Sequence, residues 1–149
     1  MIKKFFVINL FLFIFFLTNS NSDNNNYMSF KNDKVNVRYG PGLDYPIKFI
    51  FNKKNYPVEI IDQKENFRKI LDFKKNSGWI HRSQLKKSSS FITLDNAILF
   101  TDSTKFSRPI AKIEPGRLLN KKKCNLNWCR VETGEYKGWV LKKSLWGFN

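Results

Sequence analysis

The segment Gly78-Trp79-Ile80, followed five residues later by Leu85, recurs as Gly138-Trp139-Val140, followed five residues later by Leu145. The two copies lie 60 positions apart. A repeat of this size is typical of one small domain encoded twice in succession. Because about 60 residues is close to the lower limit for an independently folding domain, we expect the two copies to stabilise each other through a shared face.

Further matches extend the repeat outward from these tryptophans. Three pairs of segments correspond at offsets of 61 or 63 positions: Asn66–Ile70 with Asn127–Val131, Asn55 with Gly116, and Pro46-Ile47 plus Ile50 with Pro109-Ile110 plus Ile113. Asparagine and glycine both tolerate a left-handed turn. The repeat therefore predicts two copies that differ only in the lengths of some turns.

The hydrophobic pattern within each copy alternates with the period of a β-strand, and turn residues interrupt it every 8 to 12 positions. The expected strands are 35–38, 49–51, 57–62, 67–71 and 79–80 in the first copy, and 97–100, 110–113, 118–122, 128–132 and 138–141 in the second. Short strands at this spacing favour a small barrel or sandwich. The predicted fold class is therefore all-β.

The first 22 residues have the layout of a secretory signal peptide. Lys3 and Lys4 form a basic leader, and 13 residues from Phe5 to Leu17 are apolar except for Asn9. The alternative is a membrane anchor that stays in place, but a spanning helix needs about 20 apolar residues. We expect cleavage near residue 22 and a periplasmic or secreted protein. No second apolar run follows, so we expect no membrane span in the mature chain.

Cys124 and Cys129 are the two cysteines of the chain. Behind a signal peptide such a pair predicts a disulfide, and the turn-forming residues between them place the bridge across a hairpin. A structural zinc site needs four ligands, whereas these cysteines and the single histidine, His81, supply three. We therefore expect a disulfide and no metal.

The formal net charge is +15. A field of that sign attracts acidic polymers and anionic membrane surfaces, but the lysines are spread along the chain, with one uninterrupted run at 121–123. Spread charge is more typical of a solvated surface. We favour that interpretation, expect no nucleic-acid partner and expect a monomer.

Several of these motifs together resemble the bacterial SH3 family. In the first copy they are Asn36-Val37-Arg38-x-Gly40-Pro41, Tyr45-Pro46-Ile47, Val58-Glu59-Ile60 and Gly78-Trp79-Ile80; in the second they are Trp128-Cys129-Arg130-Val131, Gly138-Trp139-Val140 and Leu145-Trp146-Gly147. The second copy is similar to the subfamily found as tandem pairs in exported proteobacterial proteins. The resemblance implies two tandem SH3-like β-barrels, over residues 33–86 and 95–147. The second copy lacks the Asn-Val-Arg-x-Gly-Pro opening and has Ile-Leu-Phe-Thr-Asp-Ser, residues 98–103, at that place.

The resemblance implies binding of peptide or cell-wall material rather than catalysis. His81 has no cysteine near it in sequence, and both cysteines are expected to be oxidised, so a Cys–His nucleophile pair is not supported. No spacing of carboxylates selects a catalytic pair. We therefore predict a non-enzyme without cofactors.

Aromatic side chains are the candidates for a ligand-binding groove, since SH3-like barrels bind extended peptides along aromatic-lined grooves. The candidates are Tyr39, Tyr45, Phe67, Trp79, Trp128 and Trp139. Tyr39 and Tyr45 are the favoured contacts, whereas core packing is an equal alternative for Phe67 and Trp128, and packing with one exposed ring edge is favoured for Trp79 and Trp139.

Two functional hypotheses follow. In the first, the protein is an exported binding module that recognises peptidoglycan stem peptides or an envelope protein through aromatic grooves. In the second, it is a basic electrostatic adaptor that adheres to an acidic polymer or a membrane surface.

Overall fold

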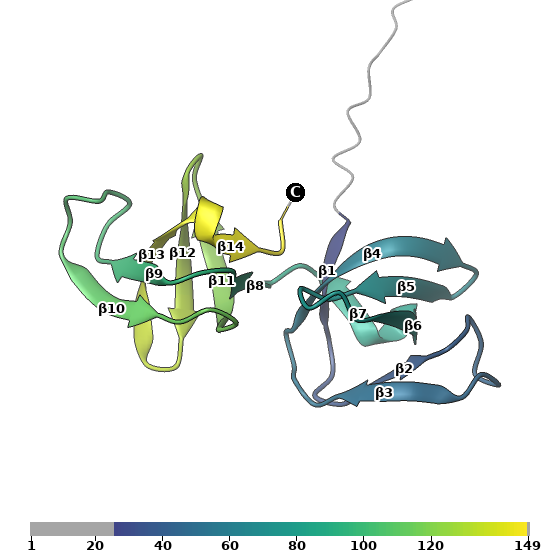
Figure 1. The fold of residues 1–149 in the computed structure, drawn as a ribbon. Coiled ribbons are helices and arrows are strands. Elements are labelled where there is room, and N and C mark those ends of the chain that lie inside the picture. Colours follow the sequence, from purple (N-terminus) through teal and green to yellow (C-terminus); the bar gives the residue numbers. More distant parts are fainter. Residues whose placement is uncertain (1–25, 149) are drawn as a thin grey trace, which may run out of the picture.

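The computed structural model describes residues 26–148, so the predicted signal peptide lies outside the described residues. Strands account for nearly all of the regular structure, together with two single turns of 3-10 helix, η1 (Arg82–Gln84) and η2 (Lys142–Ser144). The strands form two seven-stranded antiparallel sheets, one after the other along the chain (Figure 1). The prediction of an all-β protein with two tandem SH3-like barrels is confirmed.

We call β1–β7 the first barrel and β8–β14 the second barrel. The strands of the first are β1 (Tyr27–Phe30), β2 (Val35–Arg38), β3 (Ile47–Phe51), β4 (Pro57–Lys64), β5 (Phe67–Leu71), β6 (Ser77–His81) and β7 (Leu85–Lys87), in the sheet order β3-β2-β6-β5-β4-β1-β7. Those of the second are β8 (Ser90–Thr93), β9 (Ala97–Phe100), β10 (Pro109–Ile113), β11 (Leu118–Cys124), β12 (Trp128–Thr133), β13 (Tyr136–Leu141) and β14 (Leu145–Trp146), in the order β10-β9-β13-β12-β11-β8-β14. The two orders are identical position by position.

The repeated Gly-Trp segments occupy the same place in each sheet. Trp79 lies opposite Arg38 across β6 and β2, and Trp139 lies opposite Phe100 across β13 and β9. A Cβ atom added to Gly138 would lie 2.5 Å from the carbonyl oxygen of Phe100. Glycine is therefore required there by the close crossing of β9, which explains why the repeat begins with it.

One predicted correspondence is wrong by one position. The sheet register pairs Ile50 with the second residue of β2 and pairs Lys112 with the second residue of β9, so Ile50 corresponds to Lys112 and Phe51 to Ile113. The sequence match had aligned Ile50 with Ile113. Apolar residues occupy both faces of β3, so the hydrophobic pattern could not specify its register.

The disulfide prediction is confirmed. Cys124 and Cys129 are directly opposite each other on β11 and β12, are bonded through sulfur, and have Cα atoms 4.1 Å apart. This separation lies just below the usual range of roughly 4.4 to 6.8 Å. The intervening turn closes because the Asn125 side-chain oxygen accepts hydrogen bonds from the backbone N–H groups of Asn127 and Trp128, at 3.2 and 2.8 Å.

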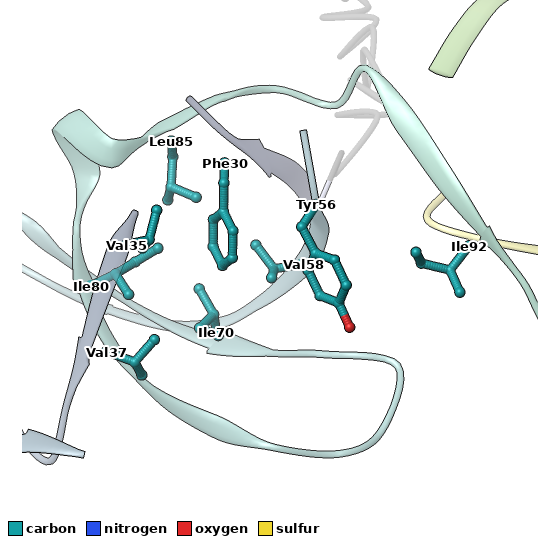
Figure 2. Packing of buried hydrophobic residues seen from close by; sticks show 9 residues of the cluster. All are labelled: Phe30, Val35, Val37, Tyr56, Val58, Ile70, Ile80, Leu85 and Ile92. Atoms are coloured by element: carbon teal, nitrogen blue, oxygen red, sulfur yellow. The ribbon is translucent and has the colours of Figure 1, made fainter. Parts of the chain in front are cut away.

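Each barrel encloses its own hydrophobic core, and the second barrel also contributes side chains to the first core: Ile92, which is fully buried, and Leu118 and Trp146, which are partly buried. In Figure 2 the buried residues of the first barrel surround Phe30 and Ile70, and Ile92 approaches the same cluster beyond Tyr56. Ile92 belongs to β8, which is part of the second sheet. The core of the first barrel is therefore completed by side chains from the second.

Buried serines make the polar part of this seam. The hydroxyl groups of Ser29 and Ser90 lie 3.1 Å apart, the backbone N–H of Ser89 donates to the Ser29 hydroxyl at 3.1 Å, and the Ser90 hydroxyl donates to the carbonyl of Asn55. Ser29 and Ser90 are both fully buried. The short segment Ser88-Ser89-Ser90 between the barrels is thus an ordered contact, with Ser90 already part of β8.

Trp146 covers the apolar part of the seam. Its ring lies edge-on to Tyr27, with ring centroids 5.1 Å apart, and 6.4 Å from the ring of Phe73. β1 and β8, which contribute to this contact, precede the ranges 33–86 and 95–147 that the sequence suggested for the two domains. The shared face expected for two such small domains is present.

Candidate ligand-binding surface

The loop between β2 and β3 carries the two most favoured candidates, Tyr39 and Tyr45. The backbone N–H of Tyr39 donates to the carbonyl of Pro46 at 3.2 Å, which closes the loop at its base. The Arg38 guanidinium donates through Nη1 to the Tyr45 carbonyl at 2.7 Å. The arginine of the opening motif therefore fixes the shape of the loop on which both tyrosines are carried.

Gly40 determines where the Tyr45 ring lies. A Cβ atom at position 40 would lie 2.2 Å from Cδ1 of Tyr45, so the ring rests directly on the glycine backbone. Tyr45 nevertheless stays 42% exposed and Tyr39 is 64% exposed. The loop thus presents two aromatic rings to solvent, one of them held by packing against the backbone beneath it.

A cation borders this aromatic pair. The Lys48 ammonium lies 5.7 Å from the centroid of the Tyr39 ring, a distance at which cation–π attraction operates. The same ammonium donates to the carbonyl of Ser77 at 2.9 Å. The surface around the two tyrosines is therefore aromatic, with the Lys48 cation at its edge and the exposed Asp44 carboxylate within the loop.

Phe67 and Trp79, the other two candidates of the first barrel, are less accessible. Phe67 is 8% exposed and packs edge-on against His81, with ring centroids 5.3 Å apart. Trp79 is half-buried, in the position expected of a packed ring with an exposed edge. His81 Nδ1 lies 2.7 Å from the Ser83 hydroxyl and caps η1, so this histidine has a structural role.

The corresponding loop of the second barrel is built differently. Thr101 N–H donates to the carbonyl of Arg108 at 3.0 Å, as in the first loop. The Ser107 hydroxyl replaces an arginine as the internal brace: it lies 2.8 Å from the carbonyl oxygen of Thr104, to which it donates, and 3.1 Å from that of Asp102. Phe106 at the tip is fully exposed. The loop therefore carries one projecting aromatic residue, without a ring packed on glycine.

A hollow lies between that loop and η2. It has a volume of about 600 Å³, and its lining includes Phe106, Trp128 and Lys142. Trp128 is 8% exposed and contacts Phe100 edge-on at 5.7 Å. Trp139 lies elsewhere, half-buried on β13, with the Lys123 ammonium 5.5 Å from its ring. The structure thus does not bring Trp128 and Trp139 into one groove.

The lysine run at 121–123 does not form one cationic patch. Lys121 lies over the ring of Phe91 at 5.7 Å, whereas Lys122 forms an ion pair with Glu132 at 2.5 Å. Lys137 pairs with the same carboxylate at 3.3 Å. Hydrogen bonds from these two lysines hold the pKa of Glu132 below its usual value. The run is therefore divided among separate contacts.

Sequence analysis did not identify Lys48 or Phe106 as contributors to these surfaces. Both lie in segments whose composition is unexceptional, and only the folded loops place them beside other aromatic residues. Within residues 26–148 no cluster of histidine, cysteine or acidic residues could hold a metal ion. No helix in that part of the chain is long and apolar enough to span a membrane.

A family model described as the bacterial SH3 domain matches residues 31–87 and 95–147. These two matches cover more than half of the chain, which therefore belongs to the bacterial SH3 family, as a tandem pair. The family consists in general of non-catalytic binding modules.

No curated protein matches the sequence. Among solved structures, NlpC2 from Trichomonas vaginalis is 14% identical, with a TM-score of 0.38, over 83% of this chain and 48% of that one. NlpC1 from the same organism is 13% identical, with a TM-score of 0.37, over 85% and 47%. An NlpC/P60 family protein from Bacillus cereus is 11% identical, with a TM-score of 0.38, over 83% and 56%. The chain spans about half the length of these structures.

Proposed function

We propose that this protein is an exported, non-catalytic binding module that recognises peptidoglycan stem peptides through the aromatic surface of its first barrel. The observation that carries the proposal is the pair of exposed rings, Tyr39 and Tyr45, on a loop braced by Arg38 and Gly40. Aromatic side chains contribute large contact areas to binding. A loop that is already ordered loses little conformational entropy when it binds.

The cation beside Tyr39 supports a carboxylate-bearing peptide as the ligand. Lys48 lies beside Tyr39, and stem peptides carry free carboxylates that a lysine can pair with. Export is supported by the disulfide between Cys124 and Cys129, which is typical of oxidising compartments.

The electrostatic adaptor receives less support. That hypothesis needs lysines that act together on one surface, but Lys121, Lys122 and Lys123 contact a phenylalanine ring, a carboxylate and a tryptophan ring respectively. Lysines that are separated in this way attract a polyanion less strongly than a continuous patch does.

The test is co-sedimentation of the mature chain with purified peptidoglycan sacculi. We expect the double variant Tyr39→Ala/Tyr45→Ala to lose at least about tenfold in affinity, because two exposed aromatic contacts contribute more than about 1.4 kcal/mol together. Leu126→Ala is the control, since Leu126 is 85% exposed and lies in the turn between Cys124 and Cys129, away from both proposed sites. Its binding should equal that of the parent.

Two further measurements separate the alternatives. A soluble stem tripeptide should compete with the sacculi for binding. If only an envelope protein competes, that protein and not peptidoglycan is the ligand. If Tyr39→Ala/Tyr45→Ala binds like the parent, while replacing Lys121, Lys122 and Lys123 by glutamine abolishes binding, the adaptor hypothesis is correct.

A further inference from the structure

The two barrels differ in how one end of the core is closed. In the first barrel four aromatic rings touch in series, with centroid distances of 5.3 Å between Phe49 and Phe51, 5.1 Å between Phe51 and Tyr56, and 6.3 Å between Tyr56 and Phe73. Large rings in contact fill the space between strands. These rings pack the end of the first barrel, and the hollow of about 430 Å³ beside Tyr56 and Phe73 also has Pro115 and Gly116 of the second barrel in its lining.

The second barrel has none of these rings. The registers of β2 with β3 and of β9 with β10 place Ala111 where the first barrel has Phe49, and Ile113 where it has Phe51. Both substitutions remove side-chain volume from the same face of the hairpin.

The remaining two ring positions are also changed. Arg117 takes the place of Tyr56, since their carbonyls accept the same hydrogen bond from the strand that opens each barrel, at 3.1 and 3.0 Å. Gly134 takes the place of Phe73, at the same distance along the chain from the equivalent Val131 and Ile70. Four aromatic residues are thus replaced by alanine, isoleucine, arginine and glycine.

A hollow of about 220 Å³ occupies this end of the second barrel. Leu99, Ala111 and Ile113 supply its apolar lining, and Leu99 and Ile113 are 0% and 4% exposed. Its volume lies below the roughly 300 to 1,000 Å³ of sites for drug-sized ligands. The hollow therefore suits a small aliphatic group.

Arg117 is held at the rim of this hollow by a buried partner. Its Nε donates to the hydroxyl of Thr133 at 3.1 Å, and Thr133 is 8% exposed. The ion pairs found within residues 26–148 are those of Glu132 with two lysines, so Arg117 has no carboxylate partner in the described part of the chain. Its two terminal nitrogens stay available, and a planar guanidinium binds a carboxylate through two parallel hydrogen bonds.

One positive charge faces the hollow. It belongs to Arg117, because Lys112 and Glu114 alternate with Ala111 and Ile113, whose side chains line the hollow, and so point to the other face of the hairpin. Tyr136 adds a half-exposed ring at the same rim. A cationic rim above an apolar floor is complementary to a carboxylate attached to a short aliphatic chain.

We propose that this hollow is a second binding site, for a carboxylate carried on a small aliphatic group such as the free C-terminal end of a peptide. Arg117 binds the carboxylate, and the space left by the missing aromatic rings receives the aliphatic group. The site lies on the second barrel and does not depend on the loop of Tyr39 and Tyr45.

The test is an NMR titration of the mature chain with N-acetylvaline, with N-acetylvalinamide as the uncharged control. We expect saturable shifts of the backbone amides of Ala111, Ile113 and Arg117, and binding of the amide weaker by about tenfold or more, because a charge-assisted hydrogen bond is lost. The amides of Val58 and Ile70 serve as an internal reference, since both residues are fully buried in the core of the first barrel.

Two variants test the two halves of the site. Arg117→Gln should weaken N-acetylvaline binding by about tenfold or more, whereas Arg130→Gln, an equal charge change at an exposed position of the same barrel, should leave it unchanged. Ala111→Phe restores the residue of the first barrel and should abolish binding while Arg117 remains. If that variant fails to fold, Arg117→Gln decides the matter.

Four results would overturn the proposal: no saturable shift of the Ala111, Ile113 and Arg117 amides, equal binding of acid and amide, Arg117→Gln binding like the parent, or equal shifts at Val58 and Ile70. Because the probe is not a peptidoglycan fragment, each of these results leaves the function proposed for the first barrel untouched.

Discussion

Among single residues of the first barrel, Tyr56 is the clearest example of a side chain in an unusual environment. It is 7% exposed and stacks on Phe30, and burial raises the pKa of its hydroxyl above the usual value of 10, with a smaller contribution from the nearby Asp72 carboxylate. Ionisation of Tyr56 would place a negative charge beside that carboxylate in a poorly solvated position. The folded protein therefore holds Tyr56 in its neutral form.

This predicts a loss of stability in alkali. Tyrosine in the unfolded chain ionises near pH 10, so the contribution of Tyr56 is complete below about pH 10 and is lost as the pH rises towards the higher pKa of the folded state, with a slope of at most about 1.4 kcal/mol per pH unit. We expect Tyr56→Phe, measured by urea unfolding from about pH 8 to 11, to lose stability less steeply than the parent. Lysine titration is common to both proteins, so equal slopes would contradict this assignment.

At the scale of elements, the hairpin of β11 and β12 is the part whose sequence and structure agree most directly. Cys129 is fully buried and Cys124 lies opposite it, so the bridge joins the core to an exposed strand end. The turn between them is closed by Asn125. A bridge across so short a loop restricts the unfolded chain only modestly.

We expect Cys124→Ala/Cys129→Ala to lower the free energy of unfolding by about 2 kcal/mol. The measurement is denaturant unfolding of parent and variant, with stoichiometric thiol labelling of the denatured exported parent as a check. If the cysteines of the denatured parent do not react with the thiol label, the bridge has formed. Full labelling of both cysteines would show that the disulfide is absent.

Most strands could be predicted because one face of each is buried and the other solvated, as in β2, where Val35 and Val37 point inward. Four strands were missed: β7 and β14, which are three and two residues long, and β1 and β8. β1 and β8 are each four residues long, and each places a serine, Ser29 or Ser90, in a fully buried position that polarity alone would assign to the surface. Their burial depends on the partner barrel, which no local pattern encodes.

The candidate site was only partly predictable for the same reason. Tyr39 and Tyr45 follow from their place in a turn rich in glycine and proline. The hollow beside Arg117 could be recognised only once the registers of β3 and β10 were known, because the sequence match had placed β10 one residue away. A one-residue shift reverses which side chains face the core, and this concealed the loss of the aromatic rings.

For the molecule as a whole, the seam makes the two barrels one structural unit. Ile92 from the second barrel is fully buried in the core cluster of the first, and Asn55 joins Asn120 across the seam through a side-chain hydrogen bond of 3.2 Å. Two domains that share a buried contact unfold less independently than domains on a flexible linker.

We therefore expect Ile92→Ala to destabilise the first barrel although the residue belongs to the second, by about 2 to 4 kcal/mol, as for other buried isoleucines cut to alanine. Hydrogen exchange of the backbone amides in β4 and β5 reports on the first barrel. Ile98→Ala is the control, since Ile98 is 48% exposed. Unchanged protection of β4 and β5 in Ile92→Ala would mean that the barrels are energetically independent.

The central claim, that exposed tyrosines rather than dispersed lysines hold the protein to its ligand, is tested most directly by the salt dependence of binding to sacculi. At about 1 M salt the Debye length falls to about 3 Å, so attraction between exposed charges is largely screened. We predict that the parent keeps most of its affinity at this ionic strength and that Tyr39→Ala/Tyr45→Ala binds weakly at every salt concentration. A steep, parallel fall in the binding of both proteins with rising salt would contradict the account.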